Sequence, residues 1–184
     1  MKKQIITACL YTVITAVLLG IVYPLAITGL SHLLFRDKAD GQLVQRNGEV
    51  IGSRLIGQPF TGPGYFHSRP SAAGAGYDAG NSGGSNLGPS SKTLVDRVTA
   101  STTAESNGTP VPVDLVTTSA SGLDPDLSPA AAFYQVARVA RERHLSETEL
   151  AERVRKSIIP RQFGLLGEPR VNVLQLNLAL NQAH

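Results

Sequence analysis

The stretch QIITACLYTVITAVLLGIVYPLAITGLSHLLF, residues 4–35, contains no Asp, Glu, Lys or Arg. A helix of about 20 apolar residues already crosses the hydrocarbon core of a bilayer. A cleaved signal peptide is the alternative, but its apolar region runs to about 7–15 residues and ends at a small-x-small site. This run is longer, and AITGL at residues 26–30 is a poor cleavage site. The sequence predicts an uncleaved transmembrane helix over residues 5–34, preceded by residues 1–4 and followed by an extramembrane domain, residues 35–184.

The flanking charges suggest an orientation for this helix. Lys2, Lys3 and the α-amino group precede the apolar run, whereas Arg36 and Lys38 follow it. Basic residues favour the cytoplasmic side of a membrane helix. We therefore expect a single-pass protein with residues 1–4 in the cytoplasm and the domain outside the cytoplasmic membrane.

Small residues recur at every fourth position of the predicted helix. Such spacing lets a second membrane helix approach closely, so that van der Waals packing drives association. The alternative is that small residues are simply common in membrane helices. Proline within the run is expected to kink the helix, because it removes a backbone donor and clashes with the preceding turn. The predicted packing face consists of Ala8, Thr12, Ala16, Gly20, Pro24 and Thr28.

The rest of the chain mixes helix and strand signals and predicts an α+β domain. Asn47-Gly48 between two short apolar runs predicts a β-hairpin. Ser128-Pro129 predicts a helix start by an N-cap and an N1 proline, and Ser146 opens a capping box. Three further segments are a helix at residues 91–101 with Leu94, Val95 and Val98 inward, a strand at 111–121, and a helix rather than a strand within 171–182.

Bulk composition excludes several classes of function. The net charge is +3, only 17% of residues are charged and 5% are aromatic, with Lys and Arg spread along the chain. This pattern is not that of a nucleic-acid-binding protein. Cys9 is the one cysteine, so neither an intrachain disulfide nor a zinc site built on cysteines is possible.

Catalytic and metal-binding signatures are weak. Residues 80–84 (GNSGG) match G-x-S-x-G, but a nucleophile elbow needs a strand before it and a helix after it. Small residues lie on both sides instead, and Ser82 as the nucleophile of a membrane-anchored hydrolase is kept only as an alternative. The four histidines are far apart, and Asp124 and Asp126 are more typical of a turn before a helix than of a cation site. We predict no metal site and no catalytic set.

Residues 68–91, SRPSAAGAGYDAGNSGGSNLGPSS, pose the main question of the domain. Composition alone indicates a flexible linker, because such a chain has almost nothing to bury. Tyr77 and Leu87 are its only large side chains besides Arg69.

Several stretches together resemble one family. They are GSRLIGQPF (52–60), YFHSRPSA (65–72), SGGSNLGPS (82–90), DLVTTSASGLDPDLSPAAA (114–132), QVARVARER (135–143) and GEPRVNVLQLNLAL (167–180). With the N-terminal span they resemble the C subunit of the Kdp-type potassium-transporting ATPase over nearly the whole chain. Two positions depart from the family pattern: Asp78, where asparagine is expected, and Asp126, where histidine is expected.

The resemblance implies a non-catalytic subunit of a bacterial inner-membrane complex that imports potassium at the expense of ATP. The expected partners are a channel-like A subunit, a P-type ATPase B subunit and a small F subunit. The C subunit is expected to assemble the complex and to act as a catalytic chaperone that raises the ATP affinity of the B subunit. A link to ATP is implied by the resemblance alone. A periplasmic domain could influence ATP binding only through coupled conformational equilibria.

Under this interpretation residues 68–91 form an ordered loop pinned by Arg69 and Tyr77, not a linker. We expect the loop to dock on the channel-like subunit near its ion entrance. A stand-alone signalling or adhesion anchor is the remaining alternative. The residues predicted for the docking or ligand loop are Arg69, Pro70, Ser71, Tyr77, Ser82, Gly83, Gly84, Ser85 and Asn86.

Overall fold

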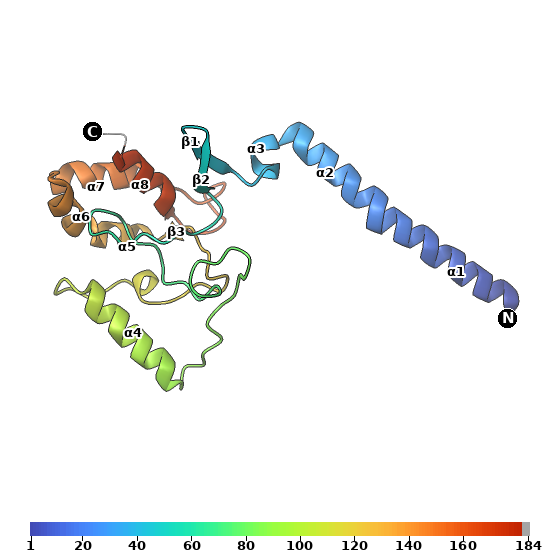
Figure 1. The fold of residues 1–184 in the computed structure, drawn as a ribbon, viewed down its shortest axis with the longest axis horizontal. Coiled ribbons are helices and arrows are strands. Elements are labelled where there is room, and N and C mark those ends of the chain that lie inside the picture. The colour runs from blue at the N-terminus through green and yellow to red at the C-terminus, as the bar shows by residue number, and fades with distance from the viewer. Residues whose placement is uncertain (182–184) are drawn as a thin grey trace. The chain divides into compact units, whose positions relative to one another are not determined.

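The computed structural model describes residues 1–181 (Figure 1). Contacts within the chain divide it into two units, Met1–Leu43 and a second one that begins at Val44. Each unit is described separately below.

The first unit is dominated by one continuous helical run, Lys2–Leu34. It comprises α1 (Lys2–Val17), the π-helical turn η1 (Leu18–Val22) and α2 (Tyr23–Leu34), and none of its residues is buried. Among the described residues it is the one helix long and apolar enough to cross a membrane. The predicted fold class, an α+β domain with one N-terminal transmembrane helix, is confirmed.

The π-helical turn directly precedes Pro24. The amide of Tyr23 donates to the carbonyl of Leu18, an i→i+5 bond. A proline lacks the donor for an ordinary helical bond, and a wider turn is one way for a helix to accommodate that loss. The turn also affects the small-residue face. A four-residue recurrence drifts by about 40° per step around an α-helix, and the wider turn counteracts part of that drift between Ala16 and Pro24.

The first unit ends with the short helix α3 (Arg36–Ala39) and with Leu43. The second unit begins within the predicted β-hairpin, whose strands β1 (Leu43–Arg46) and β2 (Glu49–Ser53) form a two-stranded sheet. Asn47 and Gly48 both have positive φ, 54° and 85°, as a type I′ turn requires. The hairpin prediction is confirmed.

The hydrophobic core lies between helices and a small antiparallel sheet of order β3-β5-β4. The strands are β3 (Asp126–Leu127), β4 (Ile158–Ile159) and β5 (Arg170–Asn172), and Val171 is paired with both Leu127 and Ile158. The helices are α5 (Pro129–Tyr134), α6 (Val136–Arg143), α7 (Glu147–Lys156) and α8 (Val173–Asn181). The buried apolar side chains of the core are Phe66, Leu115, Leu127, Ala131, Ala132, Val136, Val139, Ala140, Leu150, Val154, Val171, Val173, Leu176 and Leu180.

The predicted helix starts are confirmed by their caps. The Ser128 hydroxyl accepts from the amide of Ala131, and Pro129 is the first helical residue. The Ser146 hydroxyl accepts from the amide of Glu149 at the start of α7. The C-terminal segment is helical as expected, but a short strand, β5, comes before it.

Two predictions about local structure are wrong. Residues 111–121 form a 3-10 turn, η2 (Val113–Leu115), and irregular chain instead of a strand. Pro110 and Pro112 deprive the segment of backbone donors, and Thr117 bonds back to Val113. The helix predicted at 91–101 is confirmed as α4 (Lys92–Glu105), with Leu94 and Val98 half-buried, but Val95, predicted to point inward, is exposed. α4 lies apart from the α5–α8 cluster (Figure 1).

An extended segment through Phe66 and His67 crosses the domain without a partner strand. The Asn177 side chain accepts from the amide of Phe66 and donates to its carbonyl, both at 2.9 Å. The Gln135 side chain likewise accepts from the amide of His67, at 2.7 Å, and donates to the His67 carbonyl, at 3.2 Å. Both side chains are buried, and an unpaired buried peptide group would be costly. The side-chain amides of Asn177 and Gln135 thus replace the backbone hydrogen bonds of a neighbouring strand. They fix the position of the chain just before residues 68–91.

Candidate functional site

The small-residue loop, residues 68–91, is tied to residues 118–124 at its first end. The Arg69 guanidinium lies 3.1 Å from a carboxylate oxygen of Asp124, and both side chains are partly buried. The Tyr77 hydroxyl donates to the Arg69 carbonyl at 2.6 Å. The Ser71 hydroxyl donates to the Gly122 carbonyl and accepts from the amides of Ala73 and Tyr77. Burial raises the pKa of the Tyr77 phenol, so the phenol remains a donor at neutral pH.

The centre of the loop is tied to the same segment. The Gly83 amide and the Ser82 hydroxyl both donate to the Ser121 carbonyl, at 2.9 and 3.1 Å. Gly122 has φ +66°, and a Cβ there would lie 2.6 Å from the Ala73 nitrogen and the Gly83 oxygen. Glycine is therefore required where the two chains cross. The loop is an ordered surface element, and the expectation that Arg69 and Tyr77 hold it agrees with these contacts.

Part of the loop faces outward. Ser82 and Asn86 are exposed, whereas Gly83, Gly84 and Ser85 are half-buried. A Cβ on Gly83 would meet nothing within 4 Å, but one on Gly84 would lie 3.1 Å from the Ala120 carbonyl oxygen. Gly83 thus offers open space to a partner, and Gly84 packs against the domain. Pro70 is half-buried beside Arg69.

Three backbone amides of the loop are not free to bind a phosphate. Phosphate-binding glycine loops present free backbone N–H groups. Here the amide of Gly80 donates to the Asp78 carboxylate, that of Asn81 to the Asp78 carbonyl, and that of Gly83 to Ser121. Hydrogen bonds from the Asn81 side chain and the Gly80 amide lower the pKa of Asp78. The acidic residue at this position therefore adds a negative charge where a phosphate would have to sit.

Ser82 lacks the setting of a nucleophile elbow. It lies in irregular chain, without the strand and helix that would hold it on a strained turn. In the described part of the chain no imidazole is hydrogen-bonded to its hydroxyl, which donates to Ser121 instead. A general base within hydrogen-bond reach would be needed to activate a serine.

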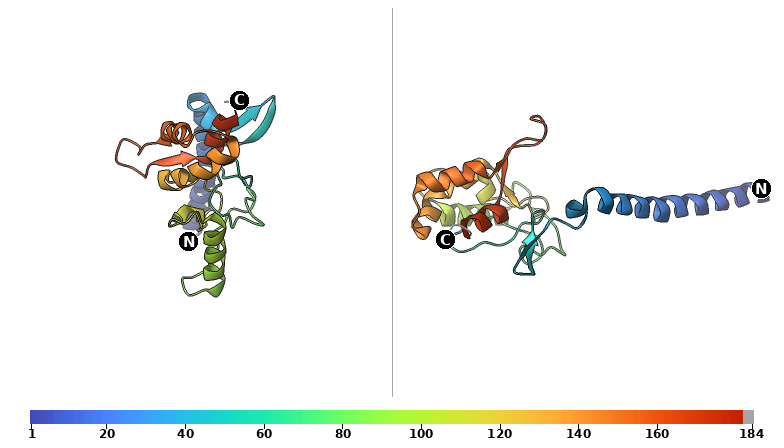
Figure 2. Two further views of the ribbon diagram at one scale, coloured as in Figure 1. Left: turned by 90° about the vertical axis from the view of Figure 1, so that its left-hand side faces the viewer. Right: turned by 90° about the horizontal axis from the view of Figure 1, so that it is seen from above.

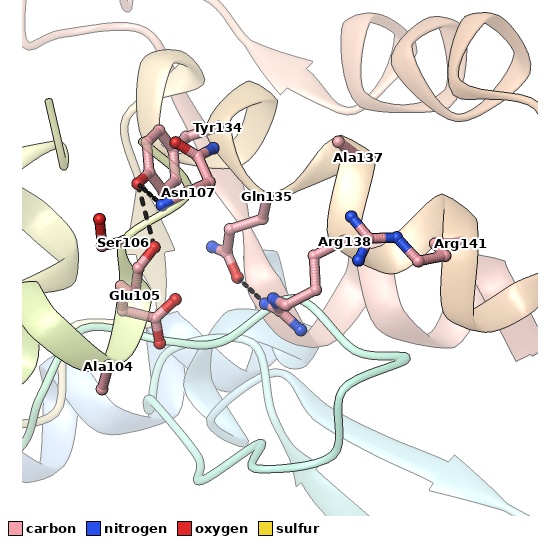
Figure 3. Close-up of a pocket in the computed structure, with 9 residues that line it drawn as sticks. All are labelled: Ala104, Glu105, Ser106, Asn107, Tyr134, Gln135, Ala137, Arg138 and Arg141. Atoms are coloured by element: carbon pink, nitrogen blue, oxygen red, sulfur yellow. Dashed lines mark hydrogen bonds between the residues drawn. The ribbon is translucent and has the colours of Figure 1, made fainter. Parts of the chain in front are cut away.

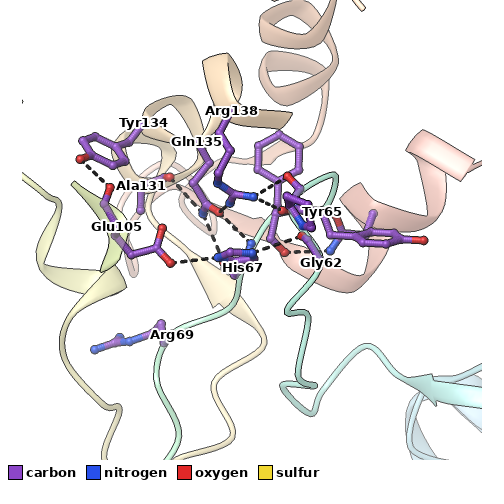
Figure 4. A network of polar contacts seen from close by, with 12 residues as sticks. Gly62, Tyr65, His67, Arg69, Glu105, Ala131, Tyr134, Gln135 and Arg138 are labelled. Atoms are coloured by element: carbon purple, nitrogen blue, oxygen red, sulfur yellow. Dashed lines mark hydrogen bonds and ion pairs between the residues drawn. The ribbon is translucent and has the colours of Figure 1, made fainter. Parts of the chain in front are cut away.

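A polar network joins α4 to the α5–α6 region (Figure 4). The Nδ1 atom of His67 lies 2.9 Å from a Glu105 carboxylate oxygen, and the Tyr134 hydroxyl donates to the Glu105 carbonyl at 3.0 Å. Arg138 donates to the Gln135 side chain and to the carbonyls of Pro63 and Tyr65. His67 is thus a hydrogen-bonding residue of the domain, as its isolation in the sequence indicates.

The charges of this network are shifted by their surroundings. The hydrogen bond with His67 is the main cause that lowers the pKa of Glu105, against a smaller opposing effect of burial. Desolvation lowers the pKa of the Arg138 guanidinium, opposed by the nearby Glu105 and Glu142 charges. The contacts of Glu105 with His67 and Tyr134 attach the C-terminal end of α4 to the rest of the domain.

A pocket of about 300 Å³ lies beside this network (Figure 3). Glu105, Asn107, Tyr134, Arg138 and Arg141 contribute its polar lining. Glu105 and Arg138 are already bound within the protein, and their charges are opposite. Arg141 also lines the pocket, so the charged lining carries one surplus positive charge.

Asp124 and Asp126 serve structural roles. Asp124 accepts from the amide of Asp126 in a turn and pairs with Arg69. Asp126 bonds to Asn172 and lies 2.9 Å from Arg170. Burial raises the pKa of Asp126, against the hydrogen bond with Asn172. In residues 1–181 no group of three His, Cys, Asp or Glu could hold a metal ion.

Sequence reasoning missed the partners of the loop. It identified Arg69, Ser71 and Ser82 but not Asp124, Gly122 and Ser121, which accept their respective hydrogen bonds. It also missed Gln135 and Asn177, whose signal was a polar residue at an apolar position of a helix. The predicted packing face of the membrane helix (Ala8, Thr12, Ala16, Gly20, Pro24 and Thr28) stays a prediction.

The sequence matches one family over almost its whole length. The match covers residues 5–182, and the family is described as K+-transporting ATPase, c chain. The chain belongs to the KdpC family. It is 64% identical over 184 residues to the potassium-transporting ATPase KdpC subunit of Koribacter versatilis, covering 98% of this chain and 95% of that protein. The KdpC subunit of Acidobacterium capsulatum is 59% identical, with 97% of each chain covered. That of Rhodospirillum rubrum is 55% identical, covering 90% and 88%. The resemblance seen in the sequence is thus confirmed.

Proposed function

We propose that this KdpC-family chain is the membrane-anchored, non-catalytic subunit of an ATP-driven potassium-import complex. The observation that carries the proposal is the ordered loop 68–91, which is held rigidly and exposes small residues without a catalytic set. Family membership supplies the complex, and the N-terminal helix supplies the membrane anchor. Its partners would be a channel-like A subunit, a P-type ATPase B subunit and a small F subunit.

The loop would dock on the channel-like subunit near its ion entrance. Small side chains and glycine let two backbones approach closely, and a loop that is ordered before docking loses little conformational entropy on binding. The side that Gly83 leaves open, flanked by the exposed Ser82 and Asn86, is the part of the loop available for this contact.

Any effect of the domain on ATP affinity would pass through the partner subunits. The amides of Gly80 and Asn81 are bonded to Asp78, that of Gly83 is bonded to Ser121, and Asp78 adds a carboxylate beside them. A subunit can still raise the affinity of a distant site if it binds preferentially to the conformation with the higher affinity. The chaperone role proposed for this chain is therefore conformational, and it needs no ATP contact.

The orientation proposed here places the N-terminus in the cytoplasm and the domain in the periplasm of a bacterial inner membrane. Three basic groups precede the apolar run at residues 4–35 and two follow it. Cys9 is the one cysteine, so a Cys9→Ala variant accepts single reporter cysteines. Labelling of Ser85→Cys in intact cells by a membrane-impermeant thiol reagent would agree with this orientation. Labelling only after lysis would contradict it and return the loop to the compartment of ATP.

Docking is tested by enlarging the surface that the proposal assigns to the partner. Gly83→Leu should leave the domain folded, because a Cβ there meets nothing within 4 Å. It should weaken copurification with the other subunits and lower the apparent potassium affinity by about tenfold, a loss of about 1.4 kcal/mol of binding.

Ala100→Leu on the exposed face of α4 is the matched control, since it adds the same bulk outside the loop. Copurification and transport unchanged by Gly83→Leu would overturn docking through this loop. If the unaltered chain purifies without a membrane ATPase, the function itself is wrong, and a stand-alone anchor takes its place.

A further inference from the structure

The loop between β4 and β5 carries three exposed large apolar side chains within four residues. Phe163, Leu165 and Leu166 are 84%, 81% and 60% exposed. In both views of Figure 2 this loop stands out from the neighbouring helices. Contiguous exposed apolar side chains are uncommon on soluble domains and usually mark an interaction site. Residues 162–167, here called the hairpin tip, include no charged residue.

The hairpin tip has a defined backbone conformation. The amide of Gln162 donates to the Leu166 carbonyl, and that of Leu166 donates back to Gln162, both at 2.9 Å. Gly164 and Leu165 donate to Arg161 and Gln162. Phe163 has φ +54°, which is unfavourable for a residue with a large side chain. A tip fixed in this way presents its apolar side chains without further ordering, as a specific binding element requires.

The charges around the tip favour a protein surface over a lipid one. Segments that lie on membranes combine apolar residues with unpaired Lys or Arg and with Trp or Tyr. Here Arg161 is paired with Glu168, and Arg170 with Asp126. The segment 157–170 contains neither Trp nor Tyr. The base of the hairpin is therefore neutral and fits the rim of an apolar protein pocket.

The size of the tip argues against self-association through it. A stable interface buries about 800 Å² on each partner, and a fully buried aromatic side chain supplies about 150–250 Å². Three side chains fall well short of that area. The tip can act only together with other contacts, which a chain already held by a membrane helix and a docking loop would provide.

We propose that the hairpin tip inserts Phe163, Leu165 and Leu166 into an apolar pocket on another subunit of the same membrane complex. This inference rests on the proposed function, because it needs a complex to bind to. It adds a second contact, separate from the loop at residues 68–91. The loop presents small residues to its partner, whereas the tip presents large apolar side chains.

The test replaces Phe163 by the photoreactive residue benzoylphenylalanine and irradiates the complex assembled in membranes. The expected result is a covalent adduct with another subunit, mapped by mass spectrometry to a run of apolar residues. Val50, an exposed apolar residue of the β1–β2 turn region, carries the probe in the control and should give no adduct at that site.

Adducts with lipid or with a second copy of this chain would overturn the proposal, and so would an intact complex without any adduct. Absence of the complex would instead contradict the proposed function. As a second measurement, Phe163→Ser/Leu165→Ser should reduce retention of this chain in the purified complex at least fivefold. Retention equal to that of Val50→Ser would also overturn the proposal.

Discussion

The small-residue loop 68–91 and the hairpin tip 162–167 both differ from what their compositions predict about packing and exposure. The loop has almost no apolar side chain to bury, yet Ala73 within it is fully buried and its backbone is bonded to residues 121–122. The tip consists largely of apolar residues, yet Phe163 and Leu165 are more than 80% exposed.

The difference shows that backbone partners, more than side-chain size, decide which of these loops belongs to the domain. Buried polar groups of the backbone must find partners, and residues 118–124 supply them to the small-residue loop. The tip satisfies its backbone within its own turn, so its side chains are left for another molecule. The following substitutions test this difference between the two loops, in order of decreasing expected change in the free energy of unfolding.

The largest effect is expected at the crossing of the loop with residue 122. Gly122→Val would place a Cβ 2.6 Å from the Ala73 nitrogen and the Gly83 oxygen, at φ +66°. Strain and overlap of this kind should cost about 2–4 kcal/mol of unfolding free energy. Urea unfolding of the full chain in detergent, followed by domain circular dichroism, measures the loss.

Gly83→Ala is the matched control, because its Cβ would meet nothing within 4 Å. It should change the unfolding free energy by less than about 0.5 kcal/mol. Equal effects of the two substitutions would show that the loop does not pack on residue 122.

A smaller loss is expected from Arg69→Ala. The change removes the contact with Asp124, 3.1 Å away, and leaves that partly buried carboxylate without its cation. We expect a loss of about 1–2 kcal/mol and faster proteolysis within residues 72–84. Arg54→Ala, at an exposed arginine, is the control for loss of a positive charge. Unchanged proteolysis in Arg69→Ala would mean that the arginine does not hold the loop.

The His67–Glu105 contact should make stability depend on acid pH. The hydrogen bond with His67 lowers the pKa of Glu105 in the folded state, so the unfolded chain binds a proton more readily. This contribution to stability is complete above the unfolded pKa and is lost as pH falls through the folded pKa.

Glu105→Gln should therefore cost about 1–2 kcal/mol at neutral pH and flatten the fall of stability in acid. Unfolding curves at a series of pH values test this, with Glu147→Gln, at an exposed glutamate of α7, as the control. An acid profile identical to that of the unaltered chain would contradict the role given to Glu105.

The smallest effect on stability is expected at the hairpin tip. Phe163→Ser/Leu165→Ser alters two exposed side chains and should change the unfolding free energy by less than about 0.5 kcal/mol. If the double variant instead unfolds more readily by 2 kcal/mol or more in the isolated chain, the tip packs on its own domain and the contrast with the small-residue loop fails.

Much of the fold follows from local sequence signals. The apolar run, Asn47-Gly48 and the two serine caps each fix one element through contacts within a few residues. The strand prediction at residues 111–121 was wrong because it gave more weight to the β-branched residues than to the two prolines. A strand also needs a partner strand, which no local sequence pattern reveals.

Only part of the candidate site could be predicted from the sequence, because its other residues are far away along the chain. Arg69 and Tyr77 stand out as large residues among small ones, whereas Ser121, Gly122 and Asp124 are ordinary turn residues about 50 positions later. The clamps of Asn177 on Phe66 and Gln135 on His67 are equally non-local. Val95 was expected inside because it follows the helical period, but α4 lies at the edge of the domain and buries nothing.

Hydrogen–deuterium exchange of the full chain, alone in detergent and within the complex, tests the central claim most directly. We expect the amides of Gly76, Asp78 and Gly83 to exchange well below the unstructured rate in the isolated chain, because each donates within the domain. Peptides covering residues 68–91 should then gain further protection in the complex. Exchange at the unstructured rate in the isolated chain, or no gain on assembly, would contradict a preformed docking loop.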